Sequence, residues 1–306
     1  MSVYVFGHKS PDTDSVAAAI AFAALNKAKG EDYIPVMQGK PNPETEMVLK
    51  RFGFTAPETM TDASGKKVAL VDHSDIAQAP DNLSAGEVVA IVDHHKIGDV
   101  TTNQPILFCN MPVGCSCTVM KILYDLEGVS VDPKVAGIML SAILSDTVNF
   151  KSPTCTDADK KAVGELKVIA GVQDTDGLFM DMLKAKSAVA GVPPMDLLHR
   201  DYKDFDMNGK KVGVGQLELA TLEQVAEMRD ALYEAMKTQK GGERHSVLLM
   251  LTDVVKEGTD LMVISDDPAL IEKAFGGKLA GNAMWIDGMM SRKKQTIPNL
   301  QKAFGC

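Results

Sequence analysis

Aspartate and histidine side chains follow three short apolar runs of the sequence, at the point where each run ends. The runs are rich in β-branched residues, so each one predicts a buried strand. In open α/β sheets, ligands bind just beyond the carboxyl ends of the strands. Oxygen and imidazole groups gathered at such an edge indicate a centre for divalent metal ions. The runs and the groups that follow them are 88–92 with Asp93, His94 and His95, 3–6 with His8, Asp12 and Asp14, and 68–71 with Asp72, His73 and Asp75.

A further aspartate, Asp146, lies near the end of a predicted helix, where the helix dipole disfavours an anion unless a cation is close. Taken singly, Asp146 is equally well explained as a solvated turn residue, and Asp14 as a helix N-cap. Seven Asp or His side chains lie at predicted strand or helix ends, and a purely structural role would have to be assumed separately for each of them. A single shared site explains all seven, so we favour it. The seven are His8, Asp12, Asp14, Asp72, His94, His95 and Asp146.

Four carboxylates and two imidazoles are enough for two ions if one carboxylate bridges them. This oxygen-rich, sulfur-free set favours Mn²⁺ or Mg²⁺ over structural Zn²⁺. Two ions about 3.5–4 Å apart hold one water between them and lower its pKa toward neutrality. The chemistry expected of these residues is therefore attack by an activated hydroxide, with the ions acting as Lewis acids for phosphoryl oxygens.

A basic triplet near the end of the chain offers the cations that a phosphate site needs. Arg292 and Lys293 suit phosphate oxygens, whereas the alternative is a solvated strand face. Residues 288–298 predict a short strand-like element, in which alternate side chains face opposite ways. Both cations therefore need an edge or a kink to reach one ligand. Lys203 is a weaker candidate and is equally well explained as a surface lysine.

Strands and helices alternate through the first part of the chain, which predicts an α/β fold with a mostly parallel sheet flanked by helices. A stretch that contains Pro and Gly and lacks periodicity indicates a linker, and a smaller α/β domain with a mixed sheet is predicted beyond it. The predicted boundaries are 1–187, 188–195 and 196–306. The predicted helices are 15–29, 44–52, 117–127, 133–144, 157–170 and 222–237, and the remaining predicted strands are 34–37, 106–108, 201–207, 211–219, 246–252 and 261–264.

The chain has 306 residues and a net charge of −9, which opposes non-specific binding to nucleic acid. We find no apolar run long enough to cross a membrane and no pattern of a secretory signal. We therefore expect a cytoplasmic protein with no nucleic-acid or membrane partner. The five cysteines lack CxxC spacing, so we interpret them as small buried residues in a reducing compartment.

Five short motifs occur in an order that resembles a known family, and the resemblance covers the whole chain. The sequence is similar to the manganese-dependent, family II inorganic pyrophosphatases of the DHH phosphoesterase superfamily. The motifs are Gly7-His8-Lys9-Ser10-Pro11-Asp12-Thr13-Asp14-Ser15, Val71-Asp72-His73, Asp93-His94-His95, Ser145-Asp146-Thr147 and Ser291-Arg292-Lys293-Lys294-Gln295.

The resemblance implies a role for each candidate residue. It also implies two Mn²⁺ per subunit with Co²⁺ as an alternative ion, Mg²⁺ that arrives with the substrate, and a homodimer formed through the N-terminal domain. The implied roles are His8 and Asp12 for the first ion, Asp14, His94 and Asp146 for the second, Asp72 for both, and His95, Lys203, Arg292 and Lys293 for pyrophosphate. We interpret Asp93, His73 and Asp75 as groups that orient these ligands.

The predicted reaction is hydrolysis of inorganic pyrophosphate to two phosphates by a hydroxide that bridges two divalent metals, in an active site between the two domains. One alternative is a DHH-type phosphodiesterase or exopolyphosphatase. Such enzymes carry a glycine-rich motif with a histidine, and residues 241–245 of this chain resemble that motif only faintly. With 5% aromatic residues, the chain offers few side chains for base stacking. The other alternative is a non-catalytic metal- or anion-binding protein. A non-catalytic protein of this kind would be expected to lack at least one of the metal ligands, and none of them is absent from this sequence.

Overall fold

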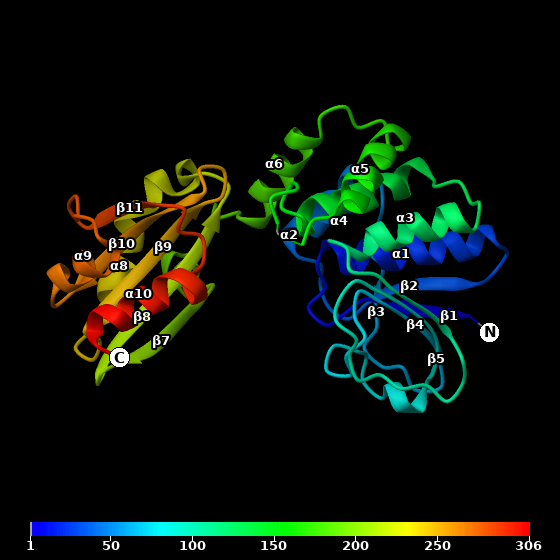
Figure 1. Ribbon diagram of the computed structural model, residues 1–306, viewed down its shortest axis with the longest axis horizontal. Helices are drawn as coiled ribbons and strands as arrows, with labels where there is room; N and C mark the ends of the chain where they lie inside the picture. Colours follow the sequence, from blue (N-terminus) through cyan, green and yellow to red (C-terminus); the bar gives the residue numbers. More distant parts are fainter. Residues whose placement is uncertain (1, 153) are drawn as a thin grey trace. The chain divides into compact units, whose positions relative to one another are not determined.

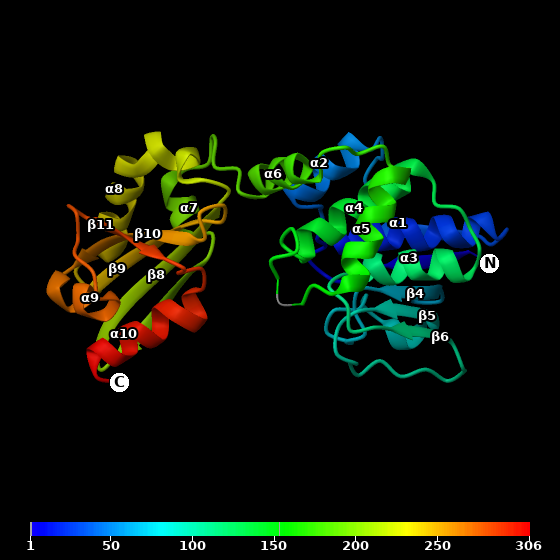
Figure 2. The ribbon, with the colours of Figure 1, turned by 45° about the horizontal axis from the view of Figure 1, so that its top comes forward.

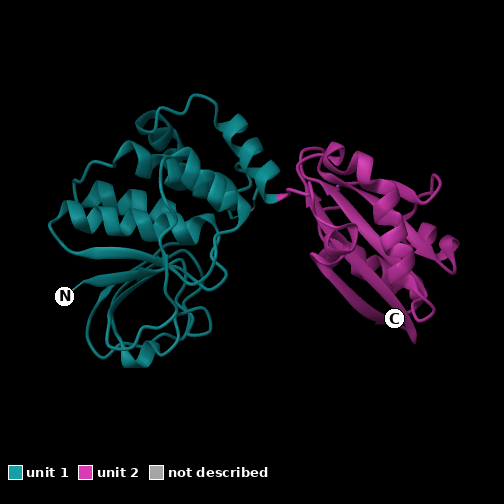
Figure 3. Ribbon diagram, turned by 180° about the vertical axis from the view of Figure 1, so that it is seen from behind, with its two compact units in different colours: residues 1–186 teal, residues 187–306 magenta. Residues whose placement is uncertain are grey.

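A computed structural model describes residues 2–152 and 154–306, and it divides the chain into two compact units (Figure 3). Unit 1 comprises residues 1–186 and unit 2 comprises residues 187–306. Each unit has its own sheet and its own hydrophobic core, so each is described by itself. Among the described residues, no helix has the length and apolar character needed to cross a membrane.

Unit 1 is built on a parallel sheet with the strand order β3-β2-β1-β4-β5-β6. This arrangement confirms the predicted α/β class. The elements in chain order are β1 (Val3–Phe6), α1 (Thr13–Ala28), β2 (Tyr33–Met37), α2 (Pro43–Arg51), β3 (Glu58–Thr59), β4 (Lys67–Val71), the 3₁₀ helix η1 (Leu83–Ala85), β5 (Glu87–Asp93), β6 (Leu107–Asn110), α3 (Ser116–Leu126), α4 (Pro133–Asp146), α5 (Asp157–Ile169) and α6 (Thr175–Lys186).

The strand order reverses direction between β1 and β4. From β1 the chain proceeds outward to β2 and β3, and it then returns to continue in the other direction through β4, β5 and β6. Because crossovers between parallel strands are right-handed, this reversal moves the later connections to the opposite face of the sheet. The helices accordingly pack on one face, and loops with η1 cover the other (Figures 1 and 2). Ligand sites in α/β sheets lie at such a switch point.

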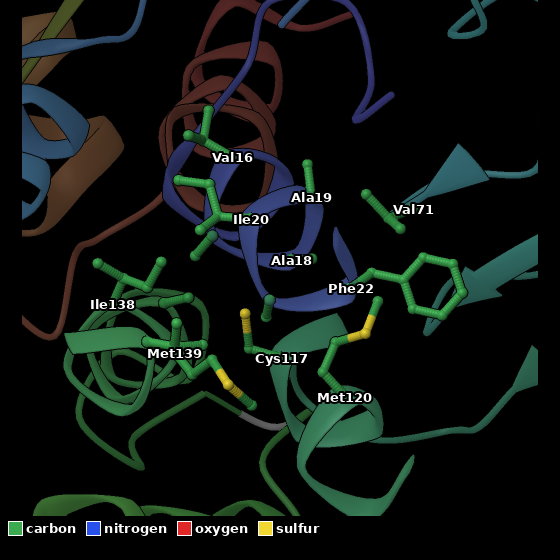
Figure 4. Packing of buried hydrophobic residues seen from close by; sticks show 14 of the residues in the cluster. Val16, Ala18, Ala19, Ile20, Phe22, Val71, Cys117, Met120, Ile138 and Met139 are labelled. Carbon is green, nitrogen blue, oxygen red and sulfur yellow. The ribbon is translucent and has the colours of Figure 1, made fainter. Parts of the chain in front are cut away.

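Helix α1 follows β1 at this switch point and is buried around most of its circumference. Its many alanines are small enough for neighbouring helices to approach closely, as expected for a helix without a polar stripe. Figure 4 shows Cys117 and Met120 of α3 beside α1, together with Ile138 and Met139 of α4. The first turn of α1 is thereby held firmly at the carboxyl edge of the sheet.

The elements predicted for the first domain agree with the structure to within two residues at each end. Helix α6 was not predicted, because Gly177 in its first turn weakens the helical signal. Asp146 is the last residue of α4, as expected from the sequence.

Unit 2 contains a mixed five-stranded sheet with the order β11-β10-β9-β8-β7, in which only the β8–β9 pairing is parallel. Apolar clusters lie on both of its faces, which explains why β9 is apolar along most of its length. Its elements are α7 (Pro194–His199), β7 (Tyr202–Met207), β8 (Lys210–Leu219), the 3₁₀ helix η2 (Leu222–Met228), α8 (Arg229–Lys240), β9 (Ser246–Asp253), β10 (Gly258–Ser265), α9 (Pro268–Phe275), β11 (Ala283–Asp287), the π-helix η3 (Arg292–Thr296) and α10 (Ile297–Phe304).

The strand-like element predicted at 288–298 is wrong, because Arg292–Thr296 forms a π-helical turn that leads into α10. The Ser291 hydroxyl accepts a hydrogen bond from the Lys294 amide, and the Gln295 side chain accepts bonds from the Met290 and Ser291 amides. Polar side chains within the segment thus satisfy backbone donors that a sheet would otherwise pair. The single helix predicted at 222–237 is divided into η2 and α8.

Two helical glycines provide a test of the packing in unit 1. A Cβ at Gly137 in α4 would lie 2.1 Å from the Phe52 ring, whereas a Cβ at Gly164 in α5 would meet nothing within 4 Å. Alanine normally stabilises a helix interior by about 1 kcal/mol relative to glycine. We expect Gly164→Ala to stabilise by that amount and Gly137→Ala to destabilise by about 1–3 kcal/mol through overpacking. Denaturant unfolding measures both, and equal effects would contradict the packing.

Candidate metal centre

Asp72 lies at the centre of the polar cluster on the carboxyl edge of the unit 1 sheet. It follows β4, is 2% exposed, and is approached by an imidazole on each side. The His8 Nε2 atom lies 3.3 Å from its Oδ2, and the His94 Nε2 atom lies 3.4 Å from its Oδ1. The Ser116 hydroxyl donates to Oδ1 at 3.1 Å. The two oxygens of one carboxylate therefore face two different sets of ligands.

The backbone of Asp72 has a φ of 62°, in the left-handed region that non-glycine residues rarely adopt. Such a conformation costs about 1–3 kcal/mol and persists where surrounding contacts impose it. The Asp72 amide donates to the Val92 carbonyl at 2.9 Å, which ties the turn to the end of β5. A strained, tied backbone at a buried carboxylate is typical of a functional site.

The ring orientations of His8 and His94 are set by backbone carbonyls. The His8 Nδ1 atom lies 2.7 Å from the Lys9 carbonyl, and the His94 Nδ1 atom lies 3.0 Å from the Val113 carbonyl. Because a carbonyl only accepts hydrogen bonds, Nδ1 carries the proton in both rings. Each Nε2 is therefore the nitrogen available to a metal ion, which is the arrangement of metal-binding histidines.

Asp12 and Asp14 occupy the start of α1 but have different surroundings. Asp12 is the N-cap, and its Oδ1 accepts from the Ser15 amide at 2.9 Å. Its other oxygen, Oδ2, lies 3.5 Å from the His8 Nε2. Asp14 is 1% exposed and accepts hydrogen bonds from the Ser116 amide at 2.7 Å and the Cys117 amide at 2.9 Å. The N-terminus of α3 thus holds Asp14, and the capping role that the sequence allowed for Asp14 belongs to Asp12.

The described residues contain four overlapping groups of three side chains, and within each group the ligand atoms lie within 4.8 Å of one another. Two of them correspond to the predicted ligand sets, and a third adds His95 beside Asp72. The fourth places Cys115 and Cys117 beside Asp14. Burial raises the pKa of both thiols well above the ordinary value, so they remain protonated and are poor ligands. The groups are His8–Asp12–Asp72, Asp14–His94–Asp146, Asp72–His94–His95 and Asp14–Cys115–Cys117.

The carboxylates of the centre dominate the electrostatics of the two imidazoles in the metal-free protein. Burial alone would lower the pKa of His8, but its contacts with Asp12 and Asp72 raise it to about 11. Burial likewise opposes the charged form of His94, and the contact with Asp72 and the charge of Asp14 raise its pKa to about 9. Both rings therefore hold positive charge at neutral pH, in the place that a cation would take.

The carboxylates respond to each other in the opposite sense. Burial and the charge of Asp72 raise the pKa of Asp14 to about 6. Burial and the charges of Asp14 and Asp72 raise the pKa of Asp146. Burial also opposes ionisation of Asp72, but its contacts with His8 and His94 outweigh that effect and lower its pKa. The donor set fits divalent cations, because a cation relieves this repulsion and all the donors are oxygen or imidazole nitrogen.

Asp93, His95 and His73 are the next residues of the predicted site. The His95 Nδ1 atom donates to Asp93 Oδ1 at 2.9 Å, which leaves the His95 Nε2 free for a ligand. The same oxygen accepts from the His94 and His95 amides at 2.8 and 3.1 Å. Asp93 therefore fixes the turn that carries both histidines. His73 is buried, its Nδ1 donates to the Val71 carbonyl, and its Nε2 has no partner in the described part of the chain.

The predicted phosphate-binding cations lie in unit 2. The Arg292 guanidinium is anchored: its Nη2 lies 2.6 Å from Asp201 Oδ1, and its Nη1 donates to the Asp201 and Val214 carbonyls. Lys203 lies on β7, two residues beyond Asp201, and is exposed. Lys293 is exposed and has no ion pair with the residues that the structure describes. In a helical turn, adjacent side chains do not face opposite ways, so the edge or kink expected for a strand is not needed.

Sequence reasoning missed the loop from Val113 to Cys117. This loop contacts three predicted ligands through the Val113 carbonyl, the Ser116 hydroxyl and two backbone amides. Most of these groups belong to the backbone, so residue type carries no signal for them. The only signal was the position of Ser116 at a predicted helix start.

Comparisons with known proteins agree with this geometry. Residues 2–143 match the DHH family, N-terminal domain, and residues 180–303 match the DHHA2 domain. The chain is 56% identical over 315 residues to a protein of Archaeoglobus fulgidus named probable manganese-dependent inorganic pyrophosphatase, covering 99% of the chain and 98% of that protein. It is 46% identical over 307 residues to the manganese-dependent inorganic pyrophosphatase of Methanothrix thermoacetophila, covering 99% and 98%. The crystal structure of a Methanococcus jannaschii protein described as a family II inorganic pyrophosphatase is similar, with a TM-score of 0.64, 42% identity, and coverage of 99% and 100%.

The protonated imidazoles make metal binding depend on pH. A divalent ion must displace protons from His8 and His94, whose pKa values are about 11 and about 9 in the metal-free protein. Because both values lie above neutrality, the apparent affinity for Mn²⁺ should rise with pH from 6 to 8, and binding should release protons. Calorimetric titration in buffers of different ionisation enthalpy measures both quantities. An affinity independent of pH would contradict the assignment of these rings as ligands.

Proposed function

The chain belongs to the family of manganese-dependent inorganic pyrophosphatases, and on this basis we propose that it hydrolyses inorganic pyrophosphate to two phosphates. The observation that carries the proposal is the central Asp72 carboxylate, whose two oxygens face two separate histidines. A carboxylate that serves two ligand groups is what a pair of divalent ions requires. The overlapping groups of ligand atoms around it support the same reading.

The residues of unit 1 would hold two ions per subunit. Asp72 would contact both ions, and Mn²⁺ would be the natural occupant, with Co²⁺ as an alternative and Mg²⁺ arriving with the substrate. When bound, the ions supply Lewis acidity toward phosphoryl oxygens and lower the pKa of a water between them. The proposed ligands are His8 and Asp12 on one side, and Asp14, His94 and Asp146 on the other.

The remaining cationic groups would bind the charged phosphates. His95 keeps Nε2 free because Asp93 holds its Nδ1. Two nitrogens of Arg292 donate to Asp201, one to its carboxylate and one to its carbonyl, so the guanidinium is fixed before a phosphate arrives. Lys203 and Lys293 are exposed lysines that would add point charges. These groups would neutralise the charge that develops on the transferred and leaving phosphates.

We further propose that the active protein is a homodimer formed through unit 1. Strand β6 is one of the two edge strands of the sheet, so one side of its backbone is unpaired within the described chain. Leu107 and Phe108 on this strand are 47% and 45% exposed, and Ile97 in the preceding loop is 71% exposed. A second copy is the occupant that fits, because two edge strands pair symmetrically and bury equivalent apolar groups.

A cytoplasmic location remains part of the proposal. All five cysteines are free. Cys115 and Cys117 are fully buried within the core, whereas Cys109 and Cys155 are partly buried and Cys306 is exposed, so the burial expected for all five holds for two. Free thiols of this kind fit a reducing compartment.

Phosphate release after Mn²⁺ loading tests the proposed reaction. Pyrophosphate with excess Mg²⁺ should be hydrolysed in strong preference to tripolyphosphate, a short oligoribonucleotide and bis(p-nitrophenyl) phosphate. Arg292→Ala should lose about 10²–10³-fold in kcat while keeping its Mn²⁺ content, because the residue stabilises charge on phosphate rather than the ions. Lys294→Ala is the control, since this neighbouring cation is exposed, whereas the Arg292 side chain is largely buried, and it has no assigned role.

Two outcomes would contradict the proposal. Preference for a diester or a longer polyphosphate would keep the metal centre and overturn the substrate. Loss of Mn²⁺ from Arg292→Ala to the same degree as the loss of activity would overturn the division of roles between metal ligands and phosphate-binding cations.

The dimer is tested by placing a charge on the edge strand. Phe108→Glu should convert a dimer to a monomer, because a carboxylate cannot be buried against an apolar partner without a large cost. Light scattering after size-exclusion chromatography measures the mass. Trp285→Glu is the control: Trp285 is 43% exposed on β11, the edge strand of the other sheet, and its substitution should leave the dimer intact. A wild-type monomer, or dissociation in both variants, would refute this surface.

A further inference from the structure

Asp159 on α5 is a fully buried carboxylate outside the predicted site, and it accepts hydrogen bonds from three residues in two segments of the chain. The Gly114 amide lies 2.9 and 3.1 Å from its two oxygens, and the Thr118 hydroxyl donates to Oδ1 at 2.6 Å. The Thr156 amide and hydroxyl each donate to Oδ2 at 2.7 Å. Bonds to a charged acceptor are stronger than those to a neutral one, so this carboxylate is a firm anchor.

The segment that Asp159 anchors is the 113–117 loop, which contacts the metal ligands. On one side of Gly114, the Val113 carbonyl accepts from His94 Nδ1 at 3.0 Å. On the other side, the Ser116 hydroxyl donates to Asp72 at 3.1 Å. The amides of residues 116 and 117 donate to Asp14. One short loop therefore sets the positions of three ligands.

The loop is also confined from the side of Asp146. A Cβ added at Gly114 would lie 2.7 Å from Thr147 Cγ2 and 3.0 Å from Asp159 Oδ2. Thr147 follows Asp146 directly and caps the end of α4. The Gly114 backbone is thus pressed between Asp159 and the residue next to the fourth ligand, which leaves it little freedom to move.

From these contacts we propose that Asp159 is a positioning residue of the metal centre, acting through the Gly114 amide on Asp14, Asp72 and His94. The proposal deepens and rests on the proposed function, because it assigns a residue that supports the same ions. A capping role alone does not explain the contacts: Asp159 forms a capping box with Thr156, but the bonds to Gly114 and Thr118 lie outside that motif. Partners that orient metal ligands typically change metal affinity by about 10–100-fold when mutated.

Three variants separate positioning from capping. Asp159→Asn keeps the shape but brings an NH₂ group against a backbone amide that needs an acceptor. Gly114→Ala keeps the Asp159 carboxylate but displaces the same loop, because its Cβ would lie 2.7 Å from Thr147 Cγ2 and 3.0 Å from Asp159 Oδ2. Thr156→Val removes the capping hydroxyl and leaves the bonds to Gly114 and Thr118. The first two should weaken Mn²⁺ binding by about tenfold or more, whereas Thr156→Val should lower thermal stability and keep Mn²⁺ affinity within about twofold.

Mn²⁺ affinity is measured by calorimetric titration of the metal-free proteins, and the electron paramagnetic resonance spectrum of the bound ions reports their ligand geometry. A changed spectrum in Asp159→Asn and Gly114→Ala, but not in Thr156→Val, is the expected result. Wild-type affinity and spectrum in Asp159→Asn would overturn the proposal, as would an equal loss of affinity in Thr156→Val. If Asp159→Asn does not fold, Gly114→Ala decides the outcome by the same criteria.

Because these readouts do not use turnover, the two proposals can fail separately. A wild-type protein that binds Mn²⁺ but does not hydrolyse pyrophosphate would overturn the proposed function and leave the role of Asp159 to be judged from binding. A wild-type protein that binds no Mn²⁺ would overturn both.

Discussion

The crowding of four carboxylates at one edge of the unit 1 sheet is the constraint to which the surrounding structure responds. Asp12, Asp14, Asp72 and Asp146 belong to groups whose ligand atoms lie within 4.8 Å of one another. At such separations, and with an effective dielectric constant of about 20, two like charges repel by about 3–4 kcal/mol. Burial and, after it, this repulsion raise the pKa values of Asp14 and Asp146. The fold offsets it with the amides at the start of α3, the dipole of α1 and the imidazoles of His8 and His94.

These compensating groups also fix where the donors stand. The His8 and His94 rings are oriented by carbonyls, and the Asp72 backbone is held in the left-handed region by its place between β4 and β5. Donors that already occupy their positions need little reorganisation when an ion arrives, so more of the interaction energy is available for binding. The backbone strain at Asp72 and the repulsion among the aspartates destabilise the fold in which these donors are held in place, and a cation relieves the repulsion.

The sequence predicted most of unit 1 and most of the side chains that gather at its carboxyl edge, because both depend on local patterns. Apolar strands that end in aspartate and histidine are visible in one dimension, and parallel strands bring their ends to one edge. The supporting loop was not predicted, because it acts through the Val113 carbonyl and two amides that every residue type possesses. The strand assigned to 288–298 was wrong for a related reason: its basic triplet was visible, but the bonds that the Ser291 and Gln295 side chains accept from backbone amides depend on side-chain placement.

The dependence of the centre on the core links metal binding to folding. The 113–117 loop begins a helix that packs against α1, and Asp159 belongs to α5, which packs on α4. A ligand held through such elements is in place only while the helices of unit 1 are packed. An ion that binds this native arrangement and not the unfolded chain stabilises the fold by about 2.7 kcal/mol when its concentration is a hundred times Kd. The carboxylates that destabilise the metal-free protein would therefore stabilise it once cations are bound. Because the contacts that position the ligands also join them to the surrounding helices, those helices would be stabilised as well.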